Sequence, residues 1–179
     1  MMLVFIFWLI FLILFLLILG TFAYAGLIAA PWVPLWQKDV RRMLTLAQIK
    51  PGEILYDLGA GDGRIIIMAA KEFGATAVGF EIAVLPYLLG LFKIRLQGLG
   101  GKAILKYADF YRNDLSQADV ICTFLTPQAM IKLKSKLKKE IKPGGRIVSY
   151  AFSLLDWPAE KIDKPSQKST TIYLYRKSV

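Results

Sequence analysis

The sequence predicts an α/β fold, in which a mostly parallel sheet carries helices on both faces and one apolar helix precedes the sheet. Three observations predict it. Short apolar strands alternate with helical patterns through most of the chain, a glycine turn joins the first strand directly to a helix, and the first 30 residues carry no charged side chain. Alternating strands and helices favour parallel pairing, because each helical crossover returns the chain to the same edge of the sheet. The 179 residues suit one domain with an appendage.

The N-terminal segment Met1–Ala30 consists mostly of Leu, Ile, Phe, Val and Ala. An apolar run of at least about 18 residues is typical of a transmembrane helix. Trp32 and Trp36 follow, where aromatic side chains tend to lie at the level of the lipid headgroups. Basic residues begin at Lys38, and none precedes the run. Because basic flanks stay in the cytoplasm, we expect a single-pass membrane protein whose following domain is cytoplasmic.

An alternative interpretation of this segment is a cleaved secretion signal, because Ala23-Tyr24-Ala25 fits the small-x-small cleavage pattern. The absence of a basic residue before the run and the length of the run favour an uncleaved anchor. The single cysteine, Cys122, forms no intrachain disulfide and agrees with a reducing compartment.

After the anchor, Pro31-Trp32-Val33-Pro34 ends the helix. We expect a transmembrane anchor over 1–30, a juxtamembrane linker and helix over 31–50, and the main domain over 51–179. Pro158–Thr171 is polar and is expected to be a loop. The expected strands are Ile54–Leu58, Ala77–Phe80, Ala103–Tyr107, Val120–Phe124, Ile147–Tyr150 and Ile172–Arg176. The expected helices are Gln37–Gln48, Arg64–Phe73, Leu85–Gln97 and Gln128–Ile141.

The formal net charge is +10, and six lysines between Lys132 and Lys142 contribute to it. Apolar residues occupy the other side of this helix, so the pattern is amphipathic with a solvated basic face. We interpret it as a surface helix. The alternative places it against anionic lipid headgroups, which attract clustered lysines by roughly 1 kcal/mol each. No motif with aromatic residues interleaved among basic ones is recognisable, so we expect no nucleic-acid partner.

The decapeptide Leu55–Arg64 is the most informative segment of the chain. An apolar strand ends in Gly59-x-Gly61-x-Gly63, which runs directly into an apolar helix. Such a turn lets a nucleotide-like ligand lie against bare backbone at a helix N-terminus. Dinucleotide-binding dehydrogenases use G-x-G-x-x-G, so the spacing argues against a nicotinamide-dependent oxidoreductase.

Acidic residues follow the next two strands, where ligands bind in open α/β sheets. Glu81 lies about 20 positions after the glycines, where a carboxylate accepts from both ribose hydroxyls. Asp109 is positioned to accept from an adenine amino group, while the neighbouring Phe110 packs on the base. The alternatives are an exposed surface glutamate at 81 and a helix N-cap at 109. Asp57 is expected to accept hydrogen bonds from the glycine turn or from a cationic amino group of the ligand.

The glycine spacing with Asp57 two residues upstream resembles motif I of the class I, seven-strand S-adenosylmethionine (SAM)-dependent methyltransferases. The resemblance implies a Rossmann-like seven-stranded sheet and SAM as cofactor. It leaves the catalytic residues unknown; Thr126 and Pro127, after the fourth strand, are candidates for the acceptor side, and Cys122 is expected to be buried rather than reactive. The implied cofactor-binding residues are Asp57, Gly59, Gly61, Gly63, Glu81, Asp109 and Phe110.

A closer resemblance covers about Pro31 to Val179 and depends on four short segments after the hydrophobic N-terminus. It is to the membrane-anchored protein-lysine methyltransferases, which include the mitochondrial enzymes that modify the ATP synthase c subunit and the adenine nucleotide translocase. It implies a lysine ε-amine as acceptor and a membrane protein as substrate. The segments are Pro31-Trp32-Val33-Pro34, Asp57-Leu58-Gly59-Ala60-Gly61-Asp62-Gly63-Arg64, Gly79-Phe80-Glu81 and Phe124-Leu125-Thr126-Pro127.

The chain contains no histidine, the commonest general base. No metal-ligand cluster is visible in the sequence, so we expect no metal. An amine acceptor fits both observations, since desolvation alone lowers the pKa of a lysine. Asp109, Tyr111 and Tyr150 stay open as groups that assist deprotonation. Two alternatives also stay open: methylation of a lipid or other small-molecule acceptor, and a SAM-binding membrane protein without catalysis.

Overall fold

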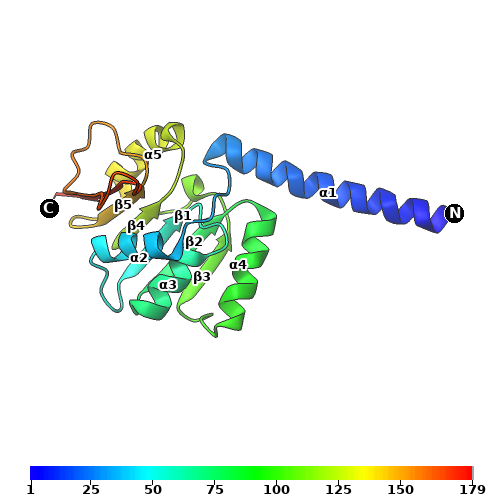
Figure 1. The fold of residues 1–179 in the computed structure, drawn as a ribbon, viewed down its shortest axis with the longest axis horizontal. Coiled ribbons are helices and arrows are strands. Elements are labelled where there is room, and N and C mark those ends of the chain that lie inside the picture. The colour runs from blue at the N-terminus through cyan, green and yellow to red at the C-terminus, as the bar shows by residue number, and fades with distance from the viewer. Residues whose placement is uncertain (179) are drawn as a thin grey trace.

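The computed structural model describes residues 1–178, in which a seven-stranded sheet is covered on both faces and a long helix projects to one side (Figure 1). The strands lie in the order β3-β2-β1-β4-β5-β7-β6. The first five in this order are parallel, and β7 runs antiparallel to both of its neighbours. This confirms the predicted fold class. The strands are β1 (Ile54–Leu58), β2 (Thr76–Glu81), β3 (Ala103–Tyr107), β4 (Val120–Thr123), β5 (Arg146–Tyr150), β6 (Lys161–Asp163) and β7 (Ile172–Arg176).

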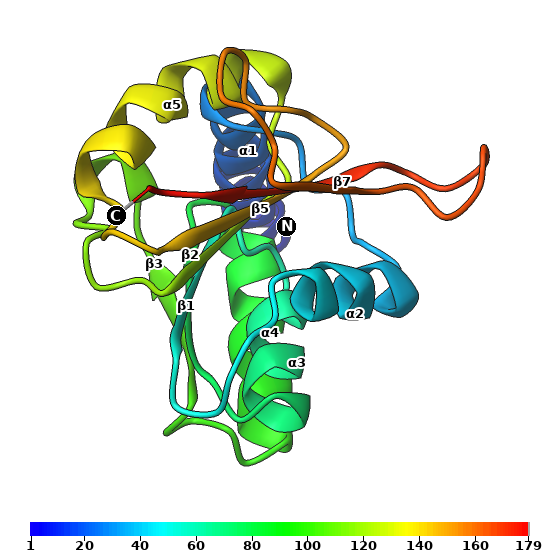
Figure 2. The same ribbon diagram turned by 90° about the vertical axis from the view of Figure 1, so that its left-hand side faces the viewer.

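Helices cover the two faces unequally. Figure 2 shows α2, α3 and α4 on one side of the sheet and α5 on the other. A short 3-10 helix, η1, follows β3 on the α5 side, since its Phe110 belongs to the same core cluster as α5. The helices are α1 (Met2–Ile28), α2 (Gln37–Leu46), α3 (Arg64–Glu72), α4 (Val84–Leu96), η1 (Phe110–Arg112) and α5 (Pro127–Glu140).

Each strand of the sheet interior buries both of its faces. In β4, Val120 and Cys122 belong to the core cluster under α2 and α3, while Ile121 belongs to the cluster under α5. Successive residues of a strand point to opposite faces, so a strand buried on both sides is a continuous apolar run. This is why short unbroken apolar runs located the strands correctly.

Two elements differ from the expectations. β6 lies within Pro158–Thr171, which was expected to be a loop, and η1 was not expected. β6 has only three residues, and Lys161 and Ile162 are exposed. Pairing with β7 therefore makes it a strand, and no local apolar pattern indicates it.

The lysines of α5 are mostly engaged by neighbouring side chains. Lys134 pairs with Asp156 and Lys136 with Glu140, at 3.1 and 2.7 Å. Lys132 lies over the ring of Tyr111, 4.3 Å from its centroid. These contacts favour the interpretation of α5 as a surface helix.

The helix α1 has 27 residues and is about 40 Å long at 1.5 Å per residue. Its mean hydropathy reaches 3.4, and none of its most apolar stretch is buried inside the protein. By length and composition it can cross a membrane. Only its C-terminal end contacts the domain: Thr21 Oγ1 accepts a hydrogen bond from the Val84 N–H at 3.3 Å, and Ala25 is buried.

Candidate functional site

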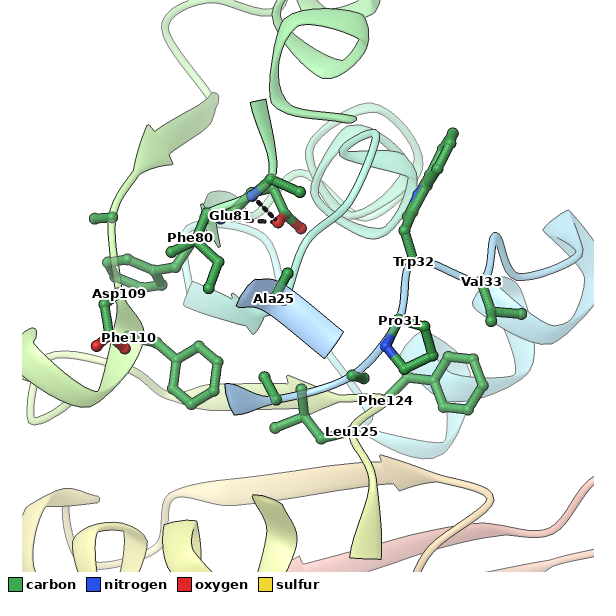
Figure 3. A pocket seen from close by; sticks show the side chains of 16 residues that line it. Ala25, Pro31, Trp32, Val33, Phe80, Glu81, Asp109, Phe110, Phe124 and Leu125 are labelled. Atoms are coloured by element: carbon green, nitrogen blue, oxygen red, sulfur yellow. Dashed lines mark hydrogen bonds between the residues drawn. The ribbon is translucent and has the colours of Figure 1, made fainter. Parts of the chain in front are cut away.

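A pocket lies at the carboxyl ends of β1, β2 and β4, and the end of α1 forms one of its walls (Figure 3). Its other walls come from the glycine turn, from the end of β2, and from the segments that follow β3 and β4. The lining residues are Ala25, Ala29, Ala30, Pro31, Trp32, Val33, Gly59, Phe80, Glu81, Ile82, Ala83, Ala108, Asp109, Phe110, Phe124 and Leu125. Of the residues that the sequence assigned to the cofactor, Gly59, Glu81, Asp109 and Phe110 line this pocket, whereas Asp57 and Gly61 line an adjoining one that also contains Trp32 and Gly59. Gly63 and the acceptor-side candidates Thr126 and Pro127 line neither.

The glycine turn requires glycine at alternate positions. Gly59, Gly61 and Gly63 have φ values of 83°, 56° and 75°, in the left-handed region that other residues rarely adopt. Gly63 is the N-cap of α3, so the turn leads directly into the helix. The Gly59 and Ala60 N–H groups donate to the Phe80 carbonyl at 3.0 and 2.9 Å. These bonds attach the turn to the end of β2.

Glu81 connects the same two segments through its side chain. Its Oε2 accepts from the Gly61 N–H at 2.7 Å, and its Oε1 accepts from the N–H groups of Ile82 and Ala83 at 2.8 and 2.7 Å. Glu81 is buried, so the alternative of an exposed surface glutamate is wrong. A carboxylate offers about four acceptor positions, which leaves capacity for a ligand hydroxyl beyond these three bonds.

Asp57 is a buried carboxyl group beneath the turn. Its Oδ2 has no hydrogen-bond partner among the described residues. Burial raises the pKa of Asp57 to about 8, and the negative charges of Glu81 and Asp62 contribute to this rise. Asp62 differs: although burial raises its pKa, hydrogen bonds from Arg64 and Lys93 outweigh that effect and hold its pKa at about 2. The turn thus donates a backbone hydrogen bond to the Glu81 side chain, and the Oδ2 atom of Asp57 stays available to accept one.

Trp32 lies directly against the turn. A Cβ added to Gly61 would lie 2.7 Å from Trp32 Nε1 and 2.8 Å from its Cδ1. The sequence suggested that this indole sits at the lipid headgroups, whereas the structure places it at the pocket. Figure 3 shows Pro31, Trp32 and Val33 together on one side of the pocket. Their part in the site was missed, although this segment carried part of the family resemblance.

Asp109 and Phe110 line the opposite side of the pocket (Figure 3). Asp109 is the N-cap of η1, and its Oδ1 accepts from the Tyr111 N–H at 2.8 Å. The capping role that the sequence offered as an alternative is therefore present. It uses one oxygen, while Oδ2 lies 3.7 Å from Arg112 Nε.

The segment after β4 contributes apolar side chains. Phe124 and Leu125 line the pocket, and Thr126 is the N-cap of α5. The Thr126 hydroxyl donates to the Ala29 carbonyl at 2.8 Å, which fastens the end of α1. Pro127 is the first residue of α5 and is exposed.

The other reactive side chains considered from the sequence are held by structural contacts. Cys122 is fully buried, as predicted, and burial raises the pKa of its thiol. The Tyr111 hydroxyl donates to the Ala129 carbonyl at 3.2 Å, and burial raises the pKa of Tyr111 to about 12. The Tyr150 hydroxyl donates to Asp39 at 3.1 Å. Neither phenol is poised to act as a base near pH 7.

These features fit a cationic nucleoside ligand. The turn offers bare backbone, Glu81 offers spare acceptor capacity, and the unpartnered Asp57 oxygen offers an acceptor for a positive charge. Within residues 1–178, no group of three or more His, Cys, Asp or Glu side chains is placed to hold a metal ion.

The sheet order and the glycine turn define a Rossmann-like SAM-dependent methyltransferase. The solved structure of an RNA methyltransferase from Salinibacter ruber, in complex with S-adenosylhomocysteine, is similar over 82% of this chain and 94% of that one. The two share 32% sequence identity and superpose with a TM-score of 0.78. Residues 57–161 match the family model of the ANTKMT methyltransferase domain, and the chain belongs to this family.

Two relatives in this family have named activities. A protein-lysine N-methyltransferase of Saccharolobus islandicus is 42% identical over 148 residues, which cover 81% of this chain and 92% of the relative. The human lysine N-methyltransferase named for the ATP synthase c subunit is 31% identical over 137 residues, or 75% of this chain. The match spans 57% of the human protein. The family match and the similarity to the S-adenosylhomocysteine complex establish SAM as the cofactor, and the two named relatives support protein-lysine methyltransferase activity.

Proposed function

We propose that this protein is a membrane-anchored methyltransferase that transfers the methyl group of SAM to a lysine ε-amine of a membrane protein. The observation that carries the proposal is the position of α1. A helix long enough to span a bilayer ends in the wall of the cofactor pocket, where Ala25 and Ala29 line it. The pocket consequently lies close to the membrane surface.

The proposed organisation keeps an anchor over 1–30, a linker and helix over 31–50, and a methyltransferase domain over 51–179. Cleavage after Ala25 would separate Thr21 from α4 and divide the pocket wall, which favours an uncleaved anchor. Basic residues follow α1 and none precedes it, which favours a cytoplasmic domain.

A membrane-protein substrate follows from this placement and from the named activity of the human relative, which is directed at the ATP synthase c subunit. Sharing one bilayer confines enzyme and acceptor to the same plane. Sharing a bilayer raises the frequency of encounter, and alignment of the lysine with the methyl group inside the site supplies the larger contribution, roughly 7–11 kcal/mol. A lysine near the headgroups is within reach of a pocket at that level.

Different residues of the site would contact different parts of SAM and of the acceptor lysine. Bound SAM supplies an activated methyl group on a sulfonium. The glycine turn, Glu81 and Phe110 would hold the nucleoside of SAM, and the unpartnered oxygen of Asp57 would accept a hydrogen bond from its positively charged end. Phe124 and Leu125 present an apolar wall, which desolvates an approaching lysine and lowers its pKa. The lysine would lose one proton to water, and its nitrogen would take the methyl group from the sulfonium, which would leave as S-adenosylhomocysteine. Thr126 and Pro127 remain our proposed acceptor-side residues, because they follow this wall.

The test uses the full chain in native membranes with methyl-labelled SAM, followed by separation into protein, lipid and RNA fractions and mass spectrometry of the labelled species. We expect label on lysine of a membrane protein, and none with the Gly61→Arg variant. Label in the lipid fraction alone would favour the second candidate, methylation of a lipid amine. Label in RNA would agree instead with the named activity of the Salinibacter protein. Bound SAM with no label in any fraction would indicate a non-catalytic SAM-binding protein.

A further inference from the structure

The outer face of α4 is apolar and uncovered. Its inner face, with Pro86, Gly90 and Ile94, is buried against the sheet. A surface helix of a soluble protein normally carries charged and polar residues on its outer face. The exposed apolar residues of α4 are instead Leu85, Leu88, Leu89, Leu91, Phe92 and Leu96, of which Phe92 and Leu96 are 61% and 70% exposed.

These residues form one continuous surface. Positions 85, 88, 92 and 96 are separated by three or four residues, so they lie above one another on one side of the helix. The charged residues of the segment 84–108 are all basic: Lys93, Arg95, Lys102 and Lys106. α4 is apolar around most of its circumference, and a helix of that kind is normally buried in a protein core or in a membrane. Among the described residues, none covers its outer side.

The position of α4 relative to α1 agrees with that pattern. The two helices are in contact, and the Val84 N–H at the start of α4 donates to Thr21 Oγ1 near the end of α1. Figure 1 shows that α1 projects from the side of the domain on which α4 lies, and that α4 runs across the direction of α1. In Figure 2, where α1 is seen nearly end-on, α4 again runs across the direction of α1. A bilayer crossed by α1 would thus lie parallel to α4.

We propose that α4 lies in the interface of the bilayer that α1 spans, with Leu88, Phe92 and Leu96 at the boundary of the acyl chains. The proposal depends on the anchoring role proposed above for α1. Arg95 on α4 and Lys102 in the turn before β3, both exposed, then face anionic headgroups, which attract basic side chains. With α1 as one attachment and α4 as a second, the domain cannot swing about its anchor, and the pocket keeps a fixed direction relative to the membrane.

Lipid explains this surface better than a second copy of the chain does. The surface is continuous with α1, whose own side chains are uncharged and exposed. Of the charged side chains beside it, Lys93 pairs with Asp62, whereas Arg95 and Lys102 are exposed. Two copies meeting face to face would bring these exposed basic side chains together, whereas anionic lipid complements them.

The test measures the surroundings of a spin label on α4. The variant Phe92→Cys of the full chain is labelled and reconstituted in vesicles of three parts phosphatidylcholine and one part phosphatidylglycerol. The native Cys122 is fully buried, so wild-type protein treated in parallel gives the background. Collisions with oxygen, which concentrates in lipid, are compared with collisions with a water-soluble nickel chelate.

Two matched positions make the result interpretable. Ile162→Cys labels an apolar residue that is 63% exposed on β6, at the opposite edge of the sheet from β3. Phe11→Cys labels the exposed middle of α1. We expect oxygen collisions to exceed nickel collisions several-fold at 92 and at 11, and the reverse at 162.

Each other outcome has a definite meaning. Lipid-like collisions at 11 with water-like collisions at 92 would overturn the inference and leave the anchor intact. Water-like collisions at both positions would overturn the proposed anchor as well. Protection from both reagents at 92, with broadening of the spectrum by a second nearby label, would overturn the inference by showing that another copy of the chain covers α4. A label at Leu96→Cys repeats the measurement one turn along the helix.

Discussion

The contact between Trp32 and Gly61 gives a sharp test of the site. In Gly61→Ala the new methyl group meets the indole at 2.7–2.8 Å, well inside van der Waals contact. Overpacking of this kind costs about 1–3 kcal/mol. A residue other than glycine at a left-handed φ costs about 1–2 kcal/mol in addition. The free energy of unfolding should therefore fall by about 2–5 kcal/mol.

Gly52→Ala separates the two costs. Gly52 has a φ of 82°, and a Cβ there would meet nothing within 4 Å. It therefore carries the backbone cost alone, about 1–2 kcal/mol. The difference between the two variants measures the clash with Trp32, which Trp32→Ala should relieve in the Gly61→Ala background.

Unfolding of the full chain in detergent micelles, followed by circular dichroism against urea, gives these energies. Calorimetry with SAM gives the affinity, which should fall at least tenfold in Gly61→Ala and stay unchanged in Gly52→Ala, because Gly61 belongs to the glycine turn beside the pocket and Gly52 lies in the loop before β1. Equal destabilisation of the two glycine variants would refute the contact, and so would a Gly61→Ala protein that gains nothing from Trp32→Ala.

Three further predictions concern the same site. First, the pKa of Asp57 is raised from 3.8 to about 8, so the folded state binds the extra proton between these values and its stability should fall as pH rises from about 4 to about 8. Asp57→Asn should flatten this part of the pH–stability curve; an unchanged curve would contradict the assignment. Second, Glu81→Gln should lower SAM affinity at least tenfold by calorimetry, because an amide has one acceptor oxygen for three backbone N–H groups. Glu72→Gln, on the exposed end of α3, is its control and should bind normally. Third, Thr126→Val should lower the free energy of unfolding by about 1–3 kcal/mol, through a lost helix cap and a lost hydrogen bond to Ala29. Thr126→Ser should restore most of it in the same urea experiment, and a Ser variant as unstable as Val would argue against the hydroxyl.

The strands were predictable where local patterns specify them. β1, β3 and β7 have the predicted bounds, because each is an apolar or alternating run between chain-breaking residues. β6 was not predictable, because its three residues are a strand only through pairing with β7. Local sequence cannot report such a pairing across a loop.

In the site, too, local patterns were predictable and tertiary contacts were not. The position of Glu81 was predictable, since a strand–helix–strand unit returns the chain to the same edge of the sheet about 20 residues later. The hydrogen bond from the Gly61 N–H to the Glu81 carboxylate was not predictable. Trp32 precedes Gly61 by 29 positions and reaches the turn only because the end of α1 docks on the domain. A tertiary contact of that kind leaves no periodicity in the sequence.

The docking of α1 has a consequence for regulation of the site. The segment from α1 to α2 is held at three separate junctions: Thr21 by the start of α4, Ala29 by Thr126 at the start of α5, and Trp32 by the turn before α3. Ala29 and Trp32 line the pocket themselves, and Val84 directly follows its lining residues Ile82 and Ala83. A displacement of the end of α1 should therefore reach the cofactor pocket, because the same backbone belongs to both. With α1 as the proposed membrane anchor, membrane attachment and cofactor binding should be coupled, so that a change in one is measurable in the other.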